Sequence, residues 1–160
     1  MSAVEERLAG LGLSLPEVAV PVAAYVPAVR DGHNRAAREG MLLGAMLAGQ
    51  AFANAPVAAV HALAYPIGGI FHVPHGLSNA LVLPHVLRFN APAACASYAE
   101  LADIVAPGCT GSDEARTQAL ITQLEQFAEL TGIETQLRQV GITEADLPLL
   151  SQQAMLQTRL

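Results

Sequence analysis

Charged side chains are scarce in this sequence. Asp, Glu, Lys and Arg make up 14% of its 160 residues, against about a quarter in an ordinary soluble domain. So few charges cannot cover the surface of a domain of this size, so we expect another domain or a second copy to cover part of it. The formal net charge of -6 provides no attraction to a phosphate backbone and argues against a nucleic-acid partner.

Cysteine is also scarce, which excludes two common kinds of site. Cys95 and Cys109 have neither the number nor the CxxC spacing of a disulfide framework or a structural zinc site. Two reduced thiols are the simplest interpretation. The start of the sequence, MSAVEERLAG, lacks the basic and continuous apolar regions of a secretory signal. We therefore expect a cytoplasmic protein.

A long stretch, residues 40–87, contains no Lys, Arg, Asp or Glu. Polar residues and prolines recur within it too often to leave the run of about 20 apolar residues that a membrane helix requires. A helix that is apolar on all sides is instead typical of the centre of a larger body. The stretch therefore predicts buried helices and no membrane span.

Apolar spacing and capping residues predict helices throughout the chain, and no segment alternates as a strand does. Asn34 and Ser112 are predicted N-caps, and Thr143 with Asp146 a variant cap. Pro66 and the glycines after it are expected to end or kink a helix and reverse the chain. The fold class is all-α, a single helical domain over residues 1–160, with helices near 4–11, 16–30, 35–54, 57–64, 75–89, 92–105, 113–131 and 143–158.

Four of the five histidines fall within 25 residues of this uncharged sequence. His61 lies in one predicted helix and His75 opens the next, so a helix, a turn and a helix can bring the two rings together. Imidazole nitrogens suit iron or zinc, but two ligands do not complete a site. The alternative is that each is an ordinary core histidine.

The segment around these histidines resembles a known family. It reads His61-Ala-Leu-Ala-Tyr-Pro-Ile-Gly-Gly-Ile-Phe-His-Val-Pro-His75-Gly-Leu-Ser-Asn79, with Leu83-Pro84-His85 after it and Gly49-Gln-Ala-Phe52-Ala-Asn54 before it. This pattern is similar to the metal-site segment of iron-containing alcohol dehydrogenases, strongly so over residues 34–106. The resemblance implies the multi-helix bundle of their C-terminal domain, which is related to the dehydroquinate synthase-like helical domain.

By this resemblance, His61 and His75 match two ligands of a catalytic Fe²⁺ or Zn²⁺, and His72 and His85 match none. The metal would hold the alcohol oxygen while hydride passes to NAD or NADP. Phe52 matches a position that lines the substrate cleft, although plain core packing is an equal alternative. Tyr65, also expected at the cleft, stands where many relatives have a further histidine, which puts a histidine-based proton relay in doubt.

The sequence also departs from the family. It contains no Asp-x-x-x-His, which supplies the other two ligands, and no glycine-rich phosphate loop. We therefore expect a chain shortened at both ends, inactive alone, with the metal absent or loosely held and NAD(P) bound only with a separate nucleotide-binding domain.

Three hypotheses remain. The first is the metal-site domain of an NAD(P)-dependent alcohol dehydrogenase acting on a small alcohol or aldehyde. Within the same group of folds, a domain like that of maleylacetate reductase or glycerol dehydrogenase is the second. The third belongs to another class: a non-catalytic helical module for self-association or partner binding. In each case the uncharged stretch predicts a homo-oligomer, most simply a two-fold dimer.

Overall fold

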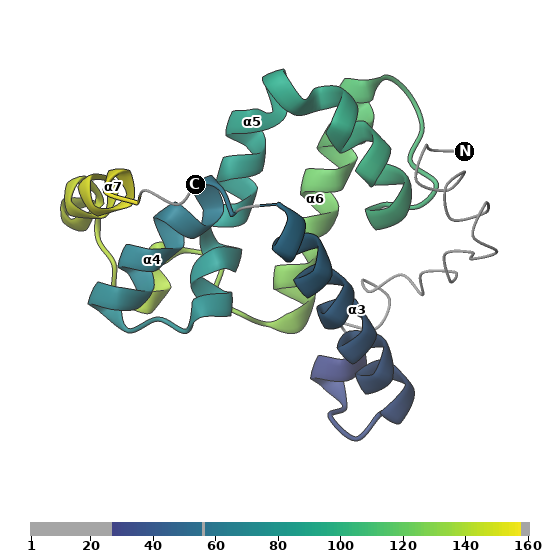
Figure 1. The fold of residues 1–160 in the computed structure, drawn as a ribbon, viewed down its shortest axis with the longest axis horizontal. Coiled ribbons are helices and arrows are strands. Elements are labelled where there is room, and N and C mark those ends of the chain that lie inside the picture. The colour runs from purple at the N-terminus through teal and green to yellow at the C-terminus, as the bar shows by residue number, and fades with distance from the viewer. Residues whose placement is uncertain (1–26, 56, 158–160) are drawn as a thin grey trace. The chain divides into compact units, whose positions relative to one another are not determined.

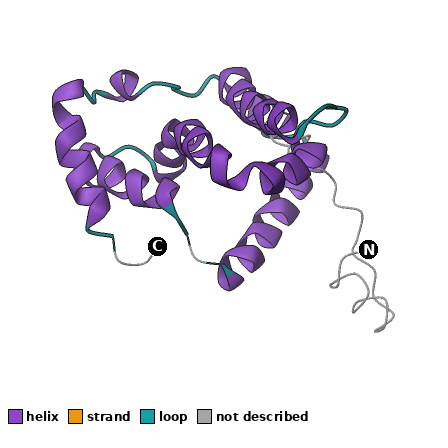
Figure 2. Ribbon diagram, turned by 90° about the horizontal axis from the view of Figure 1, so that it is seen from above, coloured by secondary structure: helices purple, strands orange, loops and turns teal. Residues whose placement is uncertain are grey.

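The computed structural model describes residues 27–55 and 57–157, in which helices are joined by loops and no strand occurs (Figures 1 and 2). This confirms the all-α prediction. The chain divides into two compact units, Met1–Gly44 and Ala45–Leu160, and the single domain stays a prediction. The elements are α3 (Arg35–Asn54), α4 (Ala59–Phe71), α5 (His75–Val105), α6 (Asp113–Thr131), two short 3-10 helices, η1 (Leu137–Val140) and η2 (Glu144–Asp146), and α7 (Leu147–Met155).

The N-terminal predictions are only partly covered by the described residues. The helix expected near 4–11 lies outside them, and of the helix expected near 16–30 only residues 27–30 are described, which are helical. α3 follows its predicted cap, because the Asn34 side-chain oxygen accepts a hydrogen bond from the Ala37 N–H at 3.0 Å.

α4 corrects one prediction. The helix does not end near residue 64: it continues through Pro66 to Phe71, and the chain reverses at residues 72–74. Pro66 removes only the hydrogen bond that the Ala62 carbonyl would accept, and its ring is buried beside Ile67. Burial of this apolar face outweighs one missing hydrogen bond, so the helix persists.

α5 contains the two helices predicted at 75–89 and 92–105, which meet at a kink. The break lies slightly later than expected, with non-helical dihedrals at Ala94 (φ -114°, ψ 15°), two residues after Pro92. Proline removes one helix donor, which is a common cause of such a kink.

α5 and α6 pack against each other. The Thr117 hydroxyl donates to the Cys95 carbonyl at 3.0 Å, and Arg116 pairs with Asp103 at 2.7 Å. Both cysteines are free, as predicted. The predicted cap at Ser112 and the end of α6 at Gly132 are also confirmed.

α4 contacts both α5 and α7, and the principal core lies among these helices. The Thr143–Asp146 capping box is present, but it opens η2, which leads directly into α7. Within the described residues no single helix could span a membrane; α3 and α4 meet that test of length and composition only as a bent pair. The buried members of the core are Ile67, Val73, Leu81, Val82, Ile142 and Leu150.

Candidate metal centre

The structure brings the two expected ligand histidines together. His61 is half-buried on α4, and His75 is the exposed first residue of α5. Their ring centroids lie 5.3 Å apart with the planes inclined at 51°. This confirms that the helix, turn and helix place the rings side by side; their role as ligands stays a prediction.

The spacing of the two rings can be compared with that of two imidazoles on one cation. With metal–nitrogen bonds of about 2.1 Å, two ligating rings have centroids about 4.6 Å apart at a right angle and about 5.3 Å apart at the tetrahedral angle. The observed separation of 5.3 Å lies at the tetrahedral end of this range. The distance between His61 and His75 therefore fits two ligands of one metal ion.

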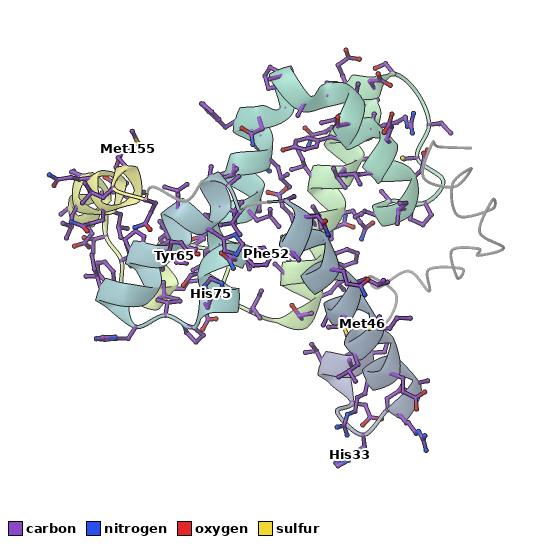
Figure 3. All side chains as sticks on the ribbon, in the orientation of Figure 1. His33, Met46, Phe52, Tyr65, His75 and Met155 are labelled. Atoms are coloured by element: carbon purple, nitrogen blue, oxygen red, sulfur yellow. The ribbon has the colours of Figure 1, made fainter. Side chains whose placement is uncertain are left out.

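Tyr65 completes a cluster of three rings, which we call the ring cluster (His61, Tyr65 and His75; Tyr65 and His75 are labelled in Figure 3). One turn after His61 on α4, Tyr65 meets the His61 ring edge-on with centroids 6.1 Å apart. It also stacks on His75 with centroids 6.1 Å apart and planes inclined at 18°. Tyr65 thus contacts both candidate ligands while 43% of its surface stays exposed.

Phe52 is not packed in the core, which was one of the two alternatives expected for this residue. It lies on α3 and is 62% exposed. No aromatic contact of Phe52 is found among the described residues. Its expected place at a substrate cleft stays a prediction.

The environment favours the neutral form of His61. Burial lowers the pKa of His61 below its ordinary value, and positive charge on His75 lowers that pKa further. A neutral imidazole keeps the lone pair that a metal ligand requires. In the described part of the chain, however, no three His, Cys, Asp or Glu side chains are placed to hold a metal ion. The ring cluster can therefore supply two donors and needs others from elsewhere.

The two remaining nearby histidines have other positions. His72 ends α4 in the left-handed conformation (φ 56°, ψ 26°), which histidine tolerates better than most residues. His85 lies on α5 beside a cavity of about 710 Å³ bounded by α5, α6 and residues 135–147. Neither belongs to the ring cluster.

Sequence reasoning assigned no role to two residues of the first turn of α5. Ser78 is fully buried, and its hydroxyl lies within hydrogen-bond distance of the carbonyls of Val73 and Pro74, at 3.2 and 3.1 Å. Asn79 places its side-chain nitrogen 3.1 Å from Nε2 of His75. Their positions three and four residues after His75 were the available signal, because residues so spaced share one side of a helix.

Comparison with known proteins identifies a matching family and several relatives that are longer than this chain. The model of the Fe-containing alcohol dehydrogenase family, C-terminal, matches residues 13–160. The 1,3-propanediol dehydrogenase of Klebsiella pneumoniae is 38% identical, over 80% of this chain and 33% of its own length. The long-chain-alcohol dehydrogenase 1 of Geobacillus thermodenitrificans is 36% identical, over 93% of this chain and 38% of its own length. The lactaldehyde reductase of Escherichia coli is 36% identical, over 74% of this chain and 31% of its own length. The chain thus spans about a third of the length of these curated relatives.

Solved structures agree with the sequence matches. A 1,3-propanediol oxidoreductase aligns with a TM-score of 0.80 at 32% identity, over 91% of this chain and 41% of that chain. An alcohol dehydrogenase from Oenococcus oeni aligns with a TM-score of 0.82 at 32% identity, over 89% of this chain and 38% of that chain.

Proposed function

The chain belongs to the Fe-containing alcohol dehydrogenase family, and on this premise we propose that it is the helical, metal-site part of an NAD(P)-dependent alcohol dehydrogenase. The observation that carries the proposal is the pairing of His61 and His75, with centroids 5.3 Å apart, inside the matched segment. A bound Fe²⁺ or Zn²⁺ supplies Lewis acidity, which polarises the oxygen of an alcohol or aldehyde.

The residues of this chain would have distinct tasks. His61, whose pKa is lowered by burial and by His75, and His75 would each donate a ring nitrogen. Tyr65 would hold both rings in place, because it meets the His61 ring edge-on and stacks on His75. No Asp or Glu occurs in α4 or in residues 75–99 of α5, so the site would require an anionic ligand from outside these helices.

The nicotinamide cofactor is proposed to bind a separate nucleotide-binding region. These 160 residues contain no glycine-rich phosphate loop between a strand and a helix, so the chain alone should bind neither NAD nor NADP. The substrate would be an alcohol or aldehyde, and a cytoplasmic location is proposed with it. The names of the relatives, which range from 1,3-propanediol and lactaldehyde to long-chain alcohols, do not narrow the choice further.

Metal titration tests the proposal directly. Calorimetry with Zn²⁺ should show weak binding to the chain, and binding should be lost in His61→Ala and in His75→Ala because each removes half of the donor pair. His85→Ala is the matched control, since its ring lies outside the ring cluster, and it should bind Zn²⁺ as the unaltered chain does. Equal binding by all four proteins, or micromolar binding of NAD or NADP to the chain alone, would contradict the proposal.

A non-catalytic, self-associating module is the second candidate. It is favoured by the large apolar side chains that α3 exposes, among them Leu42, Met46 and Phe52. This second candidate predicts that the chain forms an assembly without metal or nucleotide.

A further inference from the structure

Asn79 is the side chain that bonds to His75. Both lie on the first turns of α5, four residues apart, and the Asn79 Nδ2 is 3.1 Å from the Nε2 of the imidazole. The buried Ser78 hydroxyl fixes this turn, because it lies within hydrogen-bond distance of the Val73 and Pro74 carbonyls. The backbone beneath Asn79 is therefore held in place, and the amide approaches the ring from a defined position.

The rest of the Asn79 amide has no other partner among the described residues. Its oxygen, Oδ1, is buried and accepts no hydrogen bond. Buried polar atoms are rarely left without a partner, since the cost is about 1 to 3 kcal/mol. The contact with His75 is the one hydrogen bond that this amide makes within the described residues.

The direction of this hydrogen bond fixes the proton on the ring. An amide nitrogen can only donate, so Nε2 of a neutral His75 must accept, and its proton must then reside on Nδ1. A neutral imidazole has a single ring lone pair in its plane. The lone pair that accepts from Asn79 is therefore the one that a cation would use.

We propose that Asn79 is a positioning residue that takes the place of the cation on His75. In the metal-free chain its N–H holds the Nε2 lone pair, and with it the tautomer and the ring orientation; an arriving cation displaces the amide. This displacement rests on the ligand role proposed above for His75, whereas the tautomer of the metal-free ring does not.

The tautomer is measured by ¹⁵N nuclear magnetic resonance of the metal-free chain over a range of alkaline pH. The unaltered chain should have His75 mainly protonated on Nδ1. Asn79→Leu has a similar size but no donor, and the ratio of tautomers should move about five-fold toward Nε2–H, the weight of one neutral hydrogen bond. In Asn79→Asp the carboxylate can only accept a hydrogen bond, so the ratio of tautomers should move further toward Nε2–H. Gln118→Leu, which removes an amide from α6, is the control and should change nothing at His75.

Displacement is followed in the same spectra by adding Zn²⁺ to millimolar concentration. The side-chain NH₂ signals of Asn79 should shift together with Nε2 of His75, while Nδ1 stays protonated. A metal-free ring protonated on Nε2, or an unchanged tautomer in Asn79→Leu, would overturn the positioning role. Coordination of Zn²⁺ through Nδ1, or no response of Asn79 and His75 to Zn²⁺, would overturn the displacement, and the second result would also count against the proposed metal site.

Discussion

At the scale of single residues, the ring cluster joins two histidines from successive helices, and Asn79 bonds to one of them, His75. His61 and His75 stand out because their spacing matches a known motif. Asn79 belongs to the same motif, but its bond to His75 depends on a side-chain orientation that composition and periodicity do not reveal. His72 is close to His75 in sequence, but it was not expected to be a ligand, and its backbone ends α4.

Asp146 provides a pH test at this scale. Hydrogen bonds from the Thr143 hydroxyl and backbone N–H, at 2.7 and 2.8 Å, lower the pKa of its carboxyl. Because the folded pKa lies below the unfolded one, the stabilisation is present above the ordinary Asp pKa of about 3.9 and is lost as the pH falls through the folded pKa. The difference in free energy of unfolding between the unaltered chain and Asp146→Ala should thus be constant near neutral pH and shrink in acid.

Urea denaturation between pH 3 and pH 7 measures this difference. Thr143→Val removes the hydroxyl donor but keeps the backbone one, so it should show a weaker pH dependence of the same sign. A difference that grows in acid would show that the carboxylate does not stabilise η2.

At the scale of elements, caps were predictable and helix ends next to proline were not. Asn34 and Ser112 act locally, through hydrogen bonds to the N–H groups of the next turn, so the sequence is sufficient to find them. Whether Pro66 or Pro92 ends a helix depends on how much apolar surface the following turn buries. That quantity depends on the packed structure, and it explains why α4 is longer than predicted.

Two glycines should respond in opposite ways to the same substitution. Gly69 lies within α4 with open space where a Cβ would be, so Gly69→Ala should raise the free energy of unfolding by about 0.5 to 1 kcal/mol through helix propensity. Gly132 ends α6 at φ +72°, where Gly132→Ala should lower it by about 1 kcal/mol. Urea denaturation of both variants against the unaltered chain gives the two signs; destabilisation by Gly69→Ala would mean that another chain or unit covers this face.

At the scale of the whole molecule, the scarcity of charge predicts association. Residues 40–87 leave several large apolar side chains exposed, including Met46 and Phe52. In sedimentation equilibrium we expect a mass above 16.7 kDa that rises with concentration toward a dimer. Met46→Asp and Phe52→Asp should weaken association, since each would bury a charge at the contact. Phe89→Asp alters a side chain that is 85% exposed but outside the stretch, and it should leave the mass unchanged.

A constant mass near 16.7 kDa over a wide concentration range would rule out this dimer.

The family, the helical class and the approach of the two histidines were all accessible from the sequence. The groups that would complete the proposed metal site were not accessible, because within the described residues no three His, Cys, Asp or Glu side chains are placed to hold a metal ion.

The position of the ring cluster between Arg38 and Arg88 also determines how the protein responds to trypsin. The sequence contains no lysine, and no arginine lies between these two. Arg35 and Arg38 are exposed at the start of α3, so cleavage there would remove the segment before them and leave α4 intact. Even complete digestion would keep His61, Tyr65, His75 and Asn79 on one peptide, so a chemical label on any of them can be read by mass spectrometry from a single fragment.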